Sequence, residues 1–173
     1  MKIRIIGGCG SGKTHIAKIL SNTYGIEHAQ TDNFVWDRST NKKNSDELRD
    51  QLLSNMVQQS SWIIEGVHYM WTQNSFAEAD YIFVIRTHLA VRNWRTLKRF
   101  IKTRLKVEER NYTQGMRDLW RMFGWNSKFE KENMWVILKM TEEFKEKRFI
   151  VESNTDILTI LSNKSGANGR GHQ

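Results

Sequence analysis

An eight-residue segment near the start of the chain constrains the fold more than any other feature. It spans Gly7–Thr14, reads GGCGSGKT and matches the pattern G-x-x-x-x-G-K-[ST]. A β-branched run, Lys2–Ile6, precedes it, and a helical pattern over Thr14–Tyr24 follows it. Strand, glycine-rich loop and helix in this order predict a βα unit whose loop amides and helix N-terminus bind phosphate.

Each position of this predicted loop has a chemical reason. Glycines allow successive backbone N–H groups to turn toward an anion, where a Cβ atom would block the approach. Lys13 is expected to reach the β- and γ-phosphates of ATP, and the Thr14 hydroxyl to ligate Mg²⁺. The other residues expected to contact the nucleotide are Gly8, Cys9, Gly10, Ser11 and Gly12. The alternative is a glycine-rich turn without a ligand.

The rest of the chain alternates strand and helix patterns. Further strands are expected at Glu27–Thr31, at Trp62–Ile64 ending in Glu65-Gly66, at Tyr81–Ile85 and at Phe149–Val151. Further helices are expected at Ser45–Gln59, Leu89–Leu105, Met134–Lys147 and Asp156–Leu161. This alternation predicts an α/β fold, a P-loop NTPase three-layer sandwich with a five-stranded parallel sheet and helices on both faces.

The length of 173 residues favours one domain, expected over residues 1–162. Two stretches interrupt the alternation, an acceptor-side excursion at 33–60 and a lid-like excursion at 106–133. Residues 163–173 have no apolar face and are predicted to form a disordered tail. One cysteine argues against a disulfide framework or a multi-cysteine zinc site. No apolar run approaches the roughly 20 residues that span a bilayer, so a cytoplasmic protein without a membrane partner is expected.

The net charge of +8 is concentrated in one segment. Between Arg86 and Arg121 there are eleven basic and three acidic residues, whereas the remaining chain is neutral. Such a segment suits either the cover of a phosphate site or a surface that docks on nucleic acid.

Two acidic residues follow predicted strands. Asp32 comes directly after the second strand, and Glu65 ends the third. Ligands of parallel sheets bind beyond the carboxyl ends of the strands. Asp32 is therefore expected to bind the acceptor or act as a base, with an Asx turn as the alternative, and Glu65 to hold Mg²⁺. His68 is a candidate for the acceptor pocket, although a surface histidine is the simpler interpretation.

The predicted helix Leu89–Leu105 carries an apolar and a basic stripe. The apolar stripe, interpreted as core, contains Trp94, Leu97, Ile101 and Leu105; the basic stripe contains Arg92, Arg95, Arg99, Lys102 and Lys106. Arg95 and Arg99 lie one turn apart and suit phosphate or an adenine face, while Arg92 and Lys102 are weaker candidates. The alternative is a solvated face. Possible lid arginines are Arg104, Arg110, Arg117 and Arg121.

Four motifs together resemble a known family. They are GGCGSGKT, TDNFVW after the second strand, WIIEGVHY at the third, and RTLKR in the helix that follows YIFVI. Over about residues 1–160 the chain resembles the adenylate-kinase-related P-loop proteins of the DNA topology modulation (FlaR-like) family. The resemblance implies a nucleoside-monophosphate-kinase-like fold, ATP with Mg²⁺, and a lid over the phosphates.

The resemblance also implies roles for individual residues. Glu65 falls where adenylate kinases carry an aspartate before glycine, which makes it the metal-side acid. Arg95 and Arg99 match an Arg-x-x-x-Arg pair, one for the adenine face and one for phosphate. The adenylate kinase pattern Asp-Gly-Phe-Pro-Arg is Glu-Gly-Val-His-Tyr here, so adenylate as the acceptor is not implied.

These residues predict an ATP-dependent small-molecule kinase with a nucleoside, nucleotide or similar small acceptor. Lys13, Asp32, Arg95 and Arg99 are its expected catalytic residues, and Thr14 and Glu65 its metal ligands. One alternative is a nucleic-acid-associated ATPase or regulator of DNA topology that docks through residues 86–121. Another is a nucleotide-binding module without catalytic activity.

Overall fold

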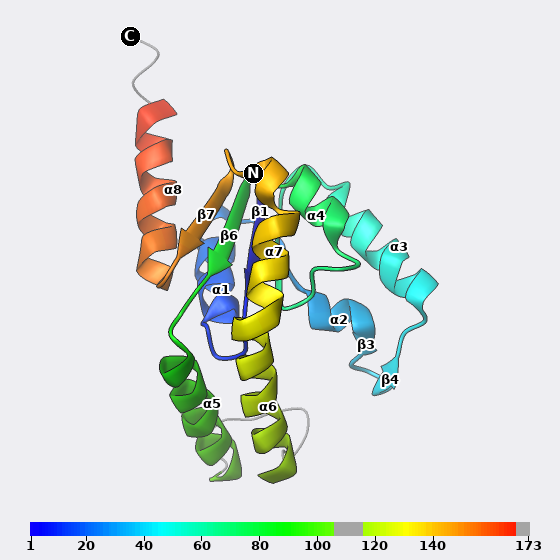
Figure 1. Cartoon of the computed structure of the whole chain (residues 1–173). Coiled ribbons are helices and arrows are strands. Elements are labelled where there is room, and N and C mark those ends of the chain that lie inside the picture. The colour runs from blue at the N-terminus through cyan, green and yellow to red at the C-terminus, as the bar shows by residue number, and fades with distance from the viewer. Residues whose placement is uncertain (106–115, 169–173) are drawn as a thin grey trace.

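The computed structural model describes residues 1–105 and 116–168 and is built around one five-stranded, all-parallel sheet (Figure 1). The strand order is β2-β5-β1-β6-β7. The bounds are Lys2–Gly7 for β1, His28–Gln30 for β2, Trp62–Gly66 for β5, Tyr81–Ile85 for β6 and Arg148–Val151 for β7. The predicted α/β class and the five parallel strands are confirmed, each strand to within two residues.

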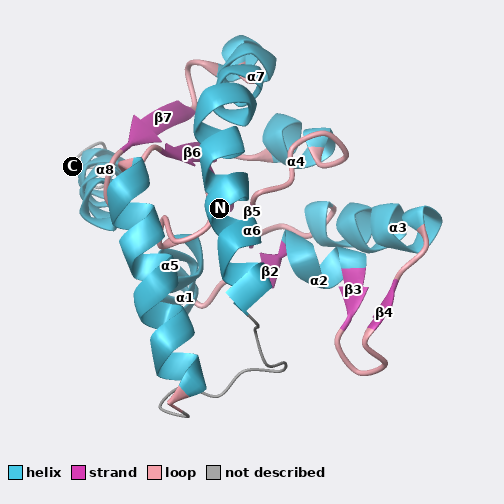
Figure 2. Cartoon of the chain, turned by 60° about the horizontal axis from the view of Figure 1, so that its bottom comes forward, coloured by secondary structure: helices cyan, strands magenta, loops and turns pink. Residues whose placement is uncertain are grey.

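Helices cover both faces of this sheet (Figure 2). Their bounds are Lys13–Tyr24 (α1), Thr31–Val35 (α2), Asp46–Val57 (α3), Gln73–Glu78 (α4), Leu89–Arg104 (α5), Met116–Lys128 (α6), Met134–Met140 (α7) and Asn154–Asn168 (α8). A π-helical turn spans Phe129–Asn133 (η1), and a 3₁₀ turn spans Glu142–Phe144 (η2).

Alternating side chains of the strands separate two cores. In β1, Ile3 and Ile5 face α1 and α8, where they pack with Ile16, Leu20, Ile157 and Leu161. Side chains of the opposite parity, including Ile64 and Val84, face α3, α4 and α7. A period-two alternation of buried apolar residues on both faces is what a central sheet between two helical layers requires.

The helical segments α6, η1 and α7 follow one another without a break and form one rod, residues 116–140. Residues 116–133 of the predicted lid-like excursion are helical, and residues 106–115 lie outside the described part. One expectation is corrected here. The helix expected over Met134–Lys147 ends at Met140, because Thr141 caps it and η2 turns the chain into β7.

The acceptor-side excursion contains regular structure. Helix α2 is followed by a short hairpin of Trp36–Asp37 (β3) and Lys42–Lys43 (β4), and then by α3. Asp37 closes the hairpin by accepting from Ser39 and Thr40, and these hydrogen bonds lower its pKa to about 2. Ser45 caps α3 by accepting from the Leu48 amide at 3.2 Å.

Helix α8 continues to Asn168. The predicted disordered tail is therefore wrong for residues 163–168, because helical backbone hydrogen bonds propagate past the last apolar contact of a helix already nucleated on the core. Residues 169–173 lie outside the described part. Within residues 1–105 and 116–168, no helix combines the length and apolar character needed to cross a membrane.

The register of the sheet brings the carboxyl ends of its strands to one edge. Ile6 of β1 lies opposite Gly66 of β5, and Gly7 lies opposite Ile85 of β6. The segments that follow β1, β2, β5 and β6 therefore leave the sheet side by side. Helices α5 and α6 lie next to each other and extend beyond this edge (Figure 1).

Candidate functional site

The glycine loop, residues 7–12, joins β1 to α1 at this edge. Gly10 and Gly12 have φ values of 77° and 95°, a left-handed region that other residues adopt at a cost. Lys13 is 8% exposed, and its ammonium donates to the Gly8 carbonyl oxygen at 2.9 Å. The Ser11 hydroxyl is buried in the loop and has no hydrogen-bond partner among the described residues.

Lys13 lies at the centre of the predicted site residues. Burial lowers its pKa, while the nearby charges of Glu65, Cys9 and Asp32 raise it and Arg99 lowers it. Residues from the glycine loop, α2, β5 and α5 thus act on one ammonium group. The structure brings together residues that the sequence separates by as many as 90 positions.

Thr14 and Glu65 form the second part of the site. The Thr14 hydroxyl donates to Glu65 Oε1 at 2.6 Å, and Glu65 is 3% exposed. His28 Nε2 lies 3.9 Å from the same oxygen, and burial lowers the pKa of His28 against the opposing effect of Glu65. A hydroxyl and a carboxylate in contact are the oxygen donors that Mg²⁺ prefers, so these residues fit the predicted ion.

Gly66 allows β5 to leave the sheet next to α2. A Cβ atom at Gly66 would lie 1.7 Å from the Thr31 hydroxyl, so no other residue fits without moving α2. This close approach fixes the position of Asp32, the next residue of α2.

Asp32 pairs with His68. Their side chains approach to 3.2 Å between Oδ1 and Nε2, and the Asp32 side chain is 54% exposed. The hydrogen bond from His68 lowers the Asp32 pKa from 3.8, against the effect of burial. The main chain of His68 is held as well, since its carbonyl oxygen accepts from Arg4 Nη2 at 2.6 Å and from Thr72 Oγ1 at 3.0 Å.

Arg95 and Arg99 both reach the glycine loop from α5. Arg99 Nη2 lies 3.3 Å from the Cys9 sulfur, and Arg95 Nη1 lies 3.5 Å from the Gly10 carbonyl oxygen. Both guanidinium groups therefore lie at the loop, the arrangement expected from their one-turn spacing.

The prediction that the apolar stripe of α5 is core is wrong. Trp94, Ile101 and Leu105 are 64%, 46% and 69% exposed, and the buried residues of the helix are Arg92, Thr96 and Phe100. The reason is that α5 extends beyond the sheet and packs on the glycine loop and α6. A polar face suits these partners better than an apolar one.

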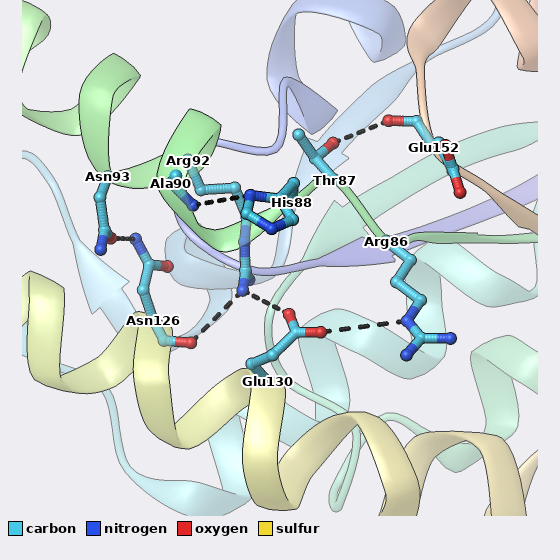
Figure 3. Close-up of polar contacts among 9 residues, drawn as sticks. All are labelled: Arg86, Thr87, His88, Ala90, Arg92, Asn93, Asn126, Glu130 and Glu152. Carbon is cyan, nitrogen blue, oxygen red and sulfur yellow. Dashed lines mark hydrogen bonds and ion pairs between the residues drawn. The ribbon is translucent and has the colours of Figure 1, made fainter.

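Arg92, the weaker candidate by sequence, has the closest contact with the loop. It is 1% exposed, and a Cβ atom at Gly8 would lie 1.8 Å from its Nη1. Its Nη2 donates to Glu130 Oε2 at 2.7 Å and to the Asn126 carbonyl oxygen at 3.4 Å (Figure 3). Burial lowers the Arg92 pKa, and Glu130 opposes this shift. The glycine at position 8 is therefore required by packing as well as by any ligand.

Further contacts fix the start of α5 between β7 and the rod (Figure 3). His88 caps α5 by accepting from the Ala90 amide at 3.3 Å, and Thr87 donates to the Glu152 carbonyl oxygen at 2.9 Å. Asn126 donates to Asn93 at 3.0 Å, and Arg86 Nε lies 3.9 Å from Glu130 Oε1. Each contact limits how far α5 can move from the loop.

Asn154, at the start of α8, is another residue that the sequence pattern does not single out. Its side-chain amide donates to the Gly12 carbonyl oxygen at 3.3 Å. A Cβ atom at Gly12 would lie only 2.9 Å from the Nδ2 atom of this amide. The β7–α8 junction thus forms one wall of the glycine loop.

The candidate lid arginines lie on both sides of the segment outside the described residues. Arg104 ends α5 with its guanidinium 5.4 Å from the Phe100 ring centre, Arg121 pairs with Asp118 at 3.5 Å, and Arg117 is exposed on α6. Arg110 and Lys106 lie outside the described residues.

A cavity of about 320 Å³ opens between the rod and the loop 67–71 that follows β5. Residues that line it include Cys9, His68, Tyr69, Trp71, Trp125 and Phe129. The cavity therefore meets the glycine loop through Cys9 and the Asp32 pair through His68. Its walls come from residues for which the sequence offered only weak signals.

No protein-family model and no curated protein matches the chain, so its function is inferred from the geometry of this site. Among the described residues, no three His, Cys, Asp or Glu side chains cluster closely enough to hold a metal ion. A Mg²⁺ ion at Thr14 and Glu65 would thus take its remaining ligands from phosphate and water, as Mg²⁺ commonly does.

We expect Glu130→Gln to lower the free energy of unfolding by about 3 kcal/mol, because it leaves the buried Arg92 guanidinium without a counter-charge. Chemical denaturation measures this loss. Glu132→Gln is the matched control, since Glu132 lies in the same π turn, is exposed and contacts Lys128 only at 3.9 Å. That variant should change stability by less than about 0.5 kcal/mol. Equal effects of the two substitutions would contradict a buried ion pair at Arg92.

The Asp32–His68 pair predicts a pH dependence of stability. Because the pKa of Asp32 is lower in the folded chain, its ionised form stabilises folding above about pH 3.8, and this stabilisation is lost as the pH falls through the folded-state pKa. The difference in unfolding free energy between the wild type and Asp32→Asn should therefore shrink below about pH 4. In a His68→Ala background this pH dependence of the difference should become weaker, with the charges of Lys13 and Arg38 still acting on Asp32. A difference that stays constant from pH 3 to pH 7 would count against the pair.

Proposed function

We propose that the chain is a P-loop phosphotransferase that moves the γ-phosphoryl group of ATP to a small acceptor. The observation that carries this proposal is the buried Lys13 ammonium inside the glycine loop, next to the contact between Thr14 and Glu65. The fold supports it, because the loop joins a central parallel strand to a helix at the carboxyl edge of the sheet.

The glycine loop suits the phosphates of ATP. A buried ammonium costs several kcal/mol unless a negative charge accompanies it, and Lys13 donates to a neutral carbonyl oxygen. Phosphate oxygens would supply that charge and accept from the unpartnered Ser11 hydroxyl. The N-terminus of α1 adds a favourable dipole for an anion at the same place.

Thr14 and Glu65 would hold Mg²⁺, which neutralises charge on the β- and γ-phosphates when bound. Thr14 contributes its hydroxyl oxygen, and Glu65 contributes a carboxylate that is buried and already in place. Neutral His28 beside Glu65 leaves the negative charge of that carboxylate available to the ion.

The proposed reaction is an in-line displacement at the γ-phosphorus. The acceptor hydroxyl oxygen forms a bond to phosphorus, the bond from phosphorus to the β,γ-bridging oxygen breaks, and its electron pair leaves on ADP. Asp32 is ionised, so it can orient the acceptor hydroxyl by accepting a hydrogen bond from it. As the new bond to phosphorus forms, Asp32 takes the proton of this hydroxyl and passes it to solvent. Lys13, Arg95 and Arg99 stabilise the charge that builds up on the transferred group and on ADP.

The resemblance to adenylate-kinase-related proteins of the DNA topology modulation family agrees with this proposal. It assigns nucleotide contacts to Arg95 and Arg99, which both lie at the glycine loop, and the metal-side acid to Glu65. Within this proposal the chain is a nucleoside-monophosphate-kinase-like enzyme with its own acceptor.

Lys13→Met is expected to reduce ADP formation about 100-fold or more, because it removes the only ammonium in contact with the loop carbonyls among the described residues. Steady-state ADP release in the presence of Mg²⁺ and an acceptor mixture measures the loss, and circular dichroism checks the fold. Lys18→Met is the control, since Lys18 is exposed on the same helix, and it should change the rate by less than about twofold. Normal turnover by Lys13→Met would overturn the proposal.

A nucleic-acid-associated ATPase is the second candidate, favoured by one observation. Trp94 on α5 and Trp120 on α6 are 64% and 67% exposed among basic side chains, as in proteins that stack bases on a charged surface. This function predicts duplex or single-strand binding whose affinity falls steeply with salt, with a log–log slope near −0.9 per neutralised duplex phosphate. The kinase proposal predicts no such binding. Fluorescence anisotropy of labelled DNA, measured between about 50 and 200 mM salt, therefore separates the two candidate functions.

A further inference from the structure

We infer that the acceptor is an uncharged molecule with an aromatic ring and a hydroxyl group, of the nucleoside class, rather than a nucleoside monophosphate. Its binding site is the cavity between the rod and the loop 67–71. This inference rests on the proposed function and names the substrate class of that same site.

The position of the cavity suits an acceptor. Cys9 of the glycine loop lines one end, directly after Gly8, whose carbonyl oxygen accepts from Lys13. His68 lines it as well and holds Asp32 at 3.2 Å. A molecule in the cavity would therefore lie next to the glycine loop, where the proposed phosphate donor binds, and next to His68, the partner of Asp32.

The size and the walls of the cavity suit one aromatic ring system. Its volume of about 320 Å³ is at the lower end of the roughly 300–1,000 Å³ typical of small-molecule sites, too small for a nucleic-acid strand. Four aromatic side chains line it: Tyr69 and Trp71 from the loop after β5, and Trp125 and Phe129 from the rod. Aromatic side chains from opposite walls favour a flat ligand ring that stacks between them.

The loop wall is held in place before any ligand binds. The Trp71 ring meets the edge of Phe34, with ring centres 6.5 Å apart at 81°, and the Arg49 guanidinium lies 4.8 Å from its centre. The His68 ring lies 5.3 Å from Trp71, and Arg4 fixes the His68 carbonyl oxygen. Such a preformed wall lowers the entropy cost of binding a rigid ring.

The charges around the cavity argue against a phosphate on the acceptor. Lys128 is the one lysine or arginine among the described residues that line it; its side chain is 63% exposed and lies 3.9 Å from Glu132. Arg92, which contacts the lining residues Asn126 and Phe129, is neutralised by Glu130 at 2.7 Å. Phosphate monoesters are usually bound by unpaired arginines in bidentate contacts, and no arginine is among the described residues that line this cavity.

The test measures ADP release by the full chain with Mg²⁺ and ATP and three sets of acceptors: the common ribo- and deoxyribonucleosides, their 5′-monophosphates, and glycerol as a hydroxyl compound without a ring. We expect at least one nucleoside to accelerate ADP release about tenfold more than its monophosphate or glycerol does. Chromatographic detection of the phosphorylated nucleoside identifies the product.

Trp125→Ala tests whether the cavity is the acceptor site. Because Trp125 is 58% exposed, the variant should fold, and it should raise the KM for the nucleoside about fivefold or more with little change in the KM for ATP. Trp125→Phe should restore most of the affinity. Trp135→Ala is the matched control, since Trp135 is similarly exposed, at 64%, on the same rod but is not among the residues that line the cavity. This variant should alter neither constant.

The outcomes separate this inference from the proposed function. Preferred phosphorylation of a monophosphate or of glycerol, or an unchanged nucleoside KM in Trp125→Ala, would overturn the inference and leave the phosphotransferase proposal standing. If no acceptor stimulates ADP release although ATP binds in a Lys13-dependent way, both fail.

Discussion

The contact between Arg92 and the glycine loop holds the site together. The guanidinium lies where a side chain at Gly8 would be, and its charge is balanced by Glu130 from the rod. One buried cation thus joins the segment after β1, helix α5 and the π turn η1, three elements far apart in the chain. Helices α5 and α6 extend beyond the sheet, and there this ion pair adds to the packing of the buried apolar side chains Phe100, Leu119 and Met122.

Glu65 also connects elements of the site through its charge, on the other side of the glycine loop. Its charge acts on Arg4, Lys13 and His28, and it accepts a hydrogen bond from Thr14. Arg4 and Lys13 are both buried cations on which Glu65 acts, and Asp32 acts on Lys13 as well. Arg95 and Arg99 add two further positive charges at the glycine loop, so cations outnumber carboxylates there. The imbalance favours an anion at the loop. Within the proposed function, this excess of positive charge supports phosphate binding at the loop, and Lys13 of the glycine-rich motif contributes to it.

The sheet was predictable because its signals are local. Runs such as YIFVI are β-branched or aromatic and lie between helical patterns, and each predicted strand is present in the structure. The proximity of Lys13, Thr14, Asp32 and Glu65 was also predictable, because they lie at or just after strand ends that share one edge in a parallel sheet.

Pattern reasoning failed where a helix packs on something other than the sheet. In α5 the apolar stripe of Trp94 and Ile101 is exposed, whereas Arg92 and Thr96 are buried against the loop. Hydrophobic periodicity identifies the helix face that packs on an apolar core. It does not identify a face that packs on the polar backbone of a loop. Likewise, the π turn that presents Phe129 and Glu130 arises from one extra residue in a helical rod, which side-chain type does not encode.

The structure also changes the interpretation of the basic segment between Arg86 and Arg121. Of the surplus between Arg86 and Arg121, Arg86 and Arg92 face Glu130, and Arg95 and Arg99 contact the glycine loop. A surface that docks on a nucleic-acid backbone needs its cations exposed and unpaired, but Arg92 is buried and paired. Arg95 and Arg99 contact the glycine loop, whereas Lys98, Arg104, Arg117 and Arg121 are exposed. The location of these cations therefore favours a phosphate group held inside the protein over a polyanion bound outside it.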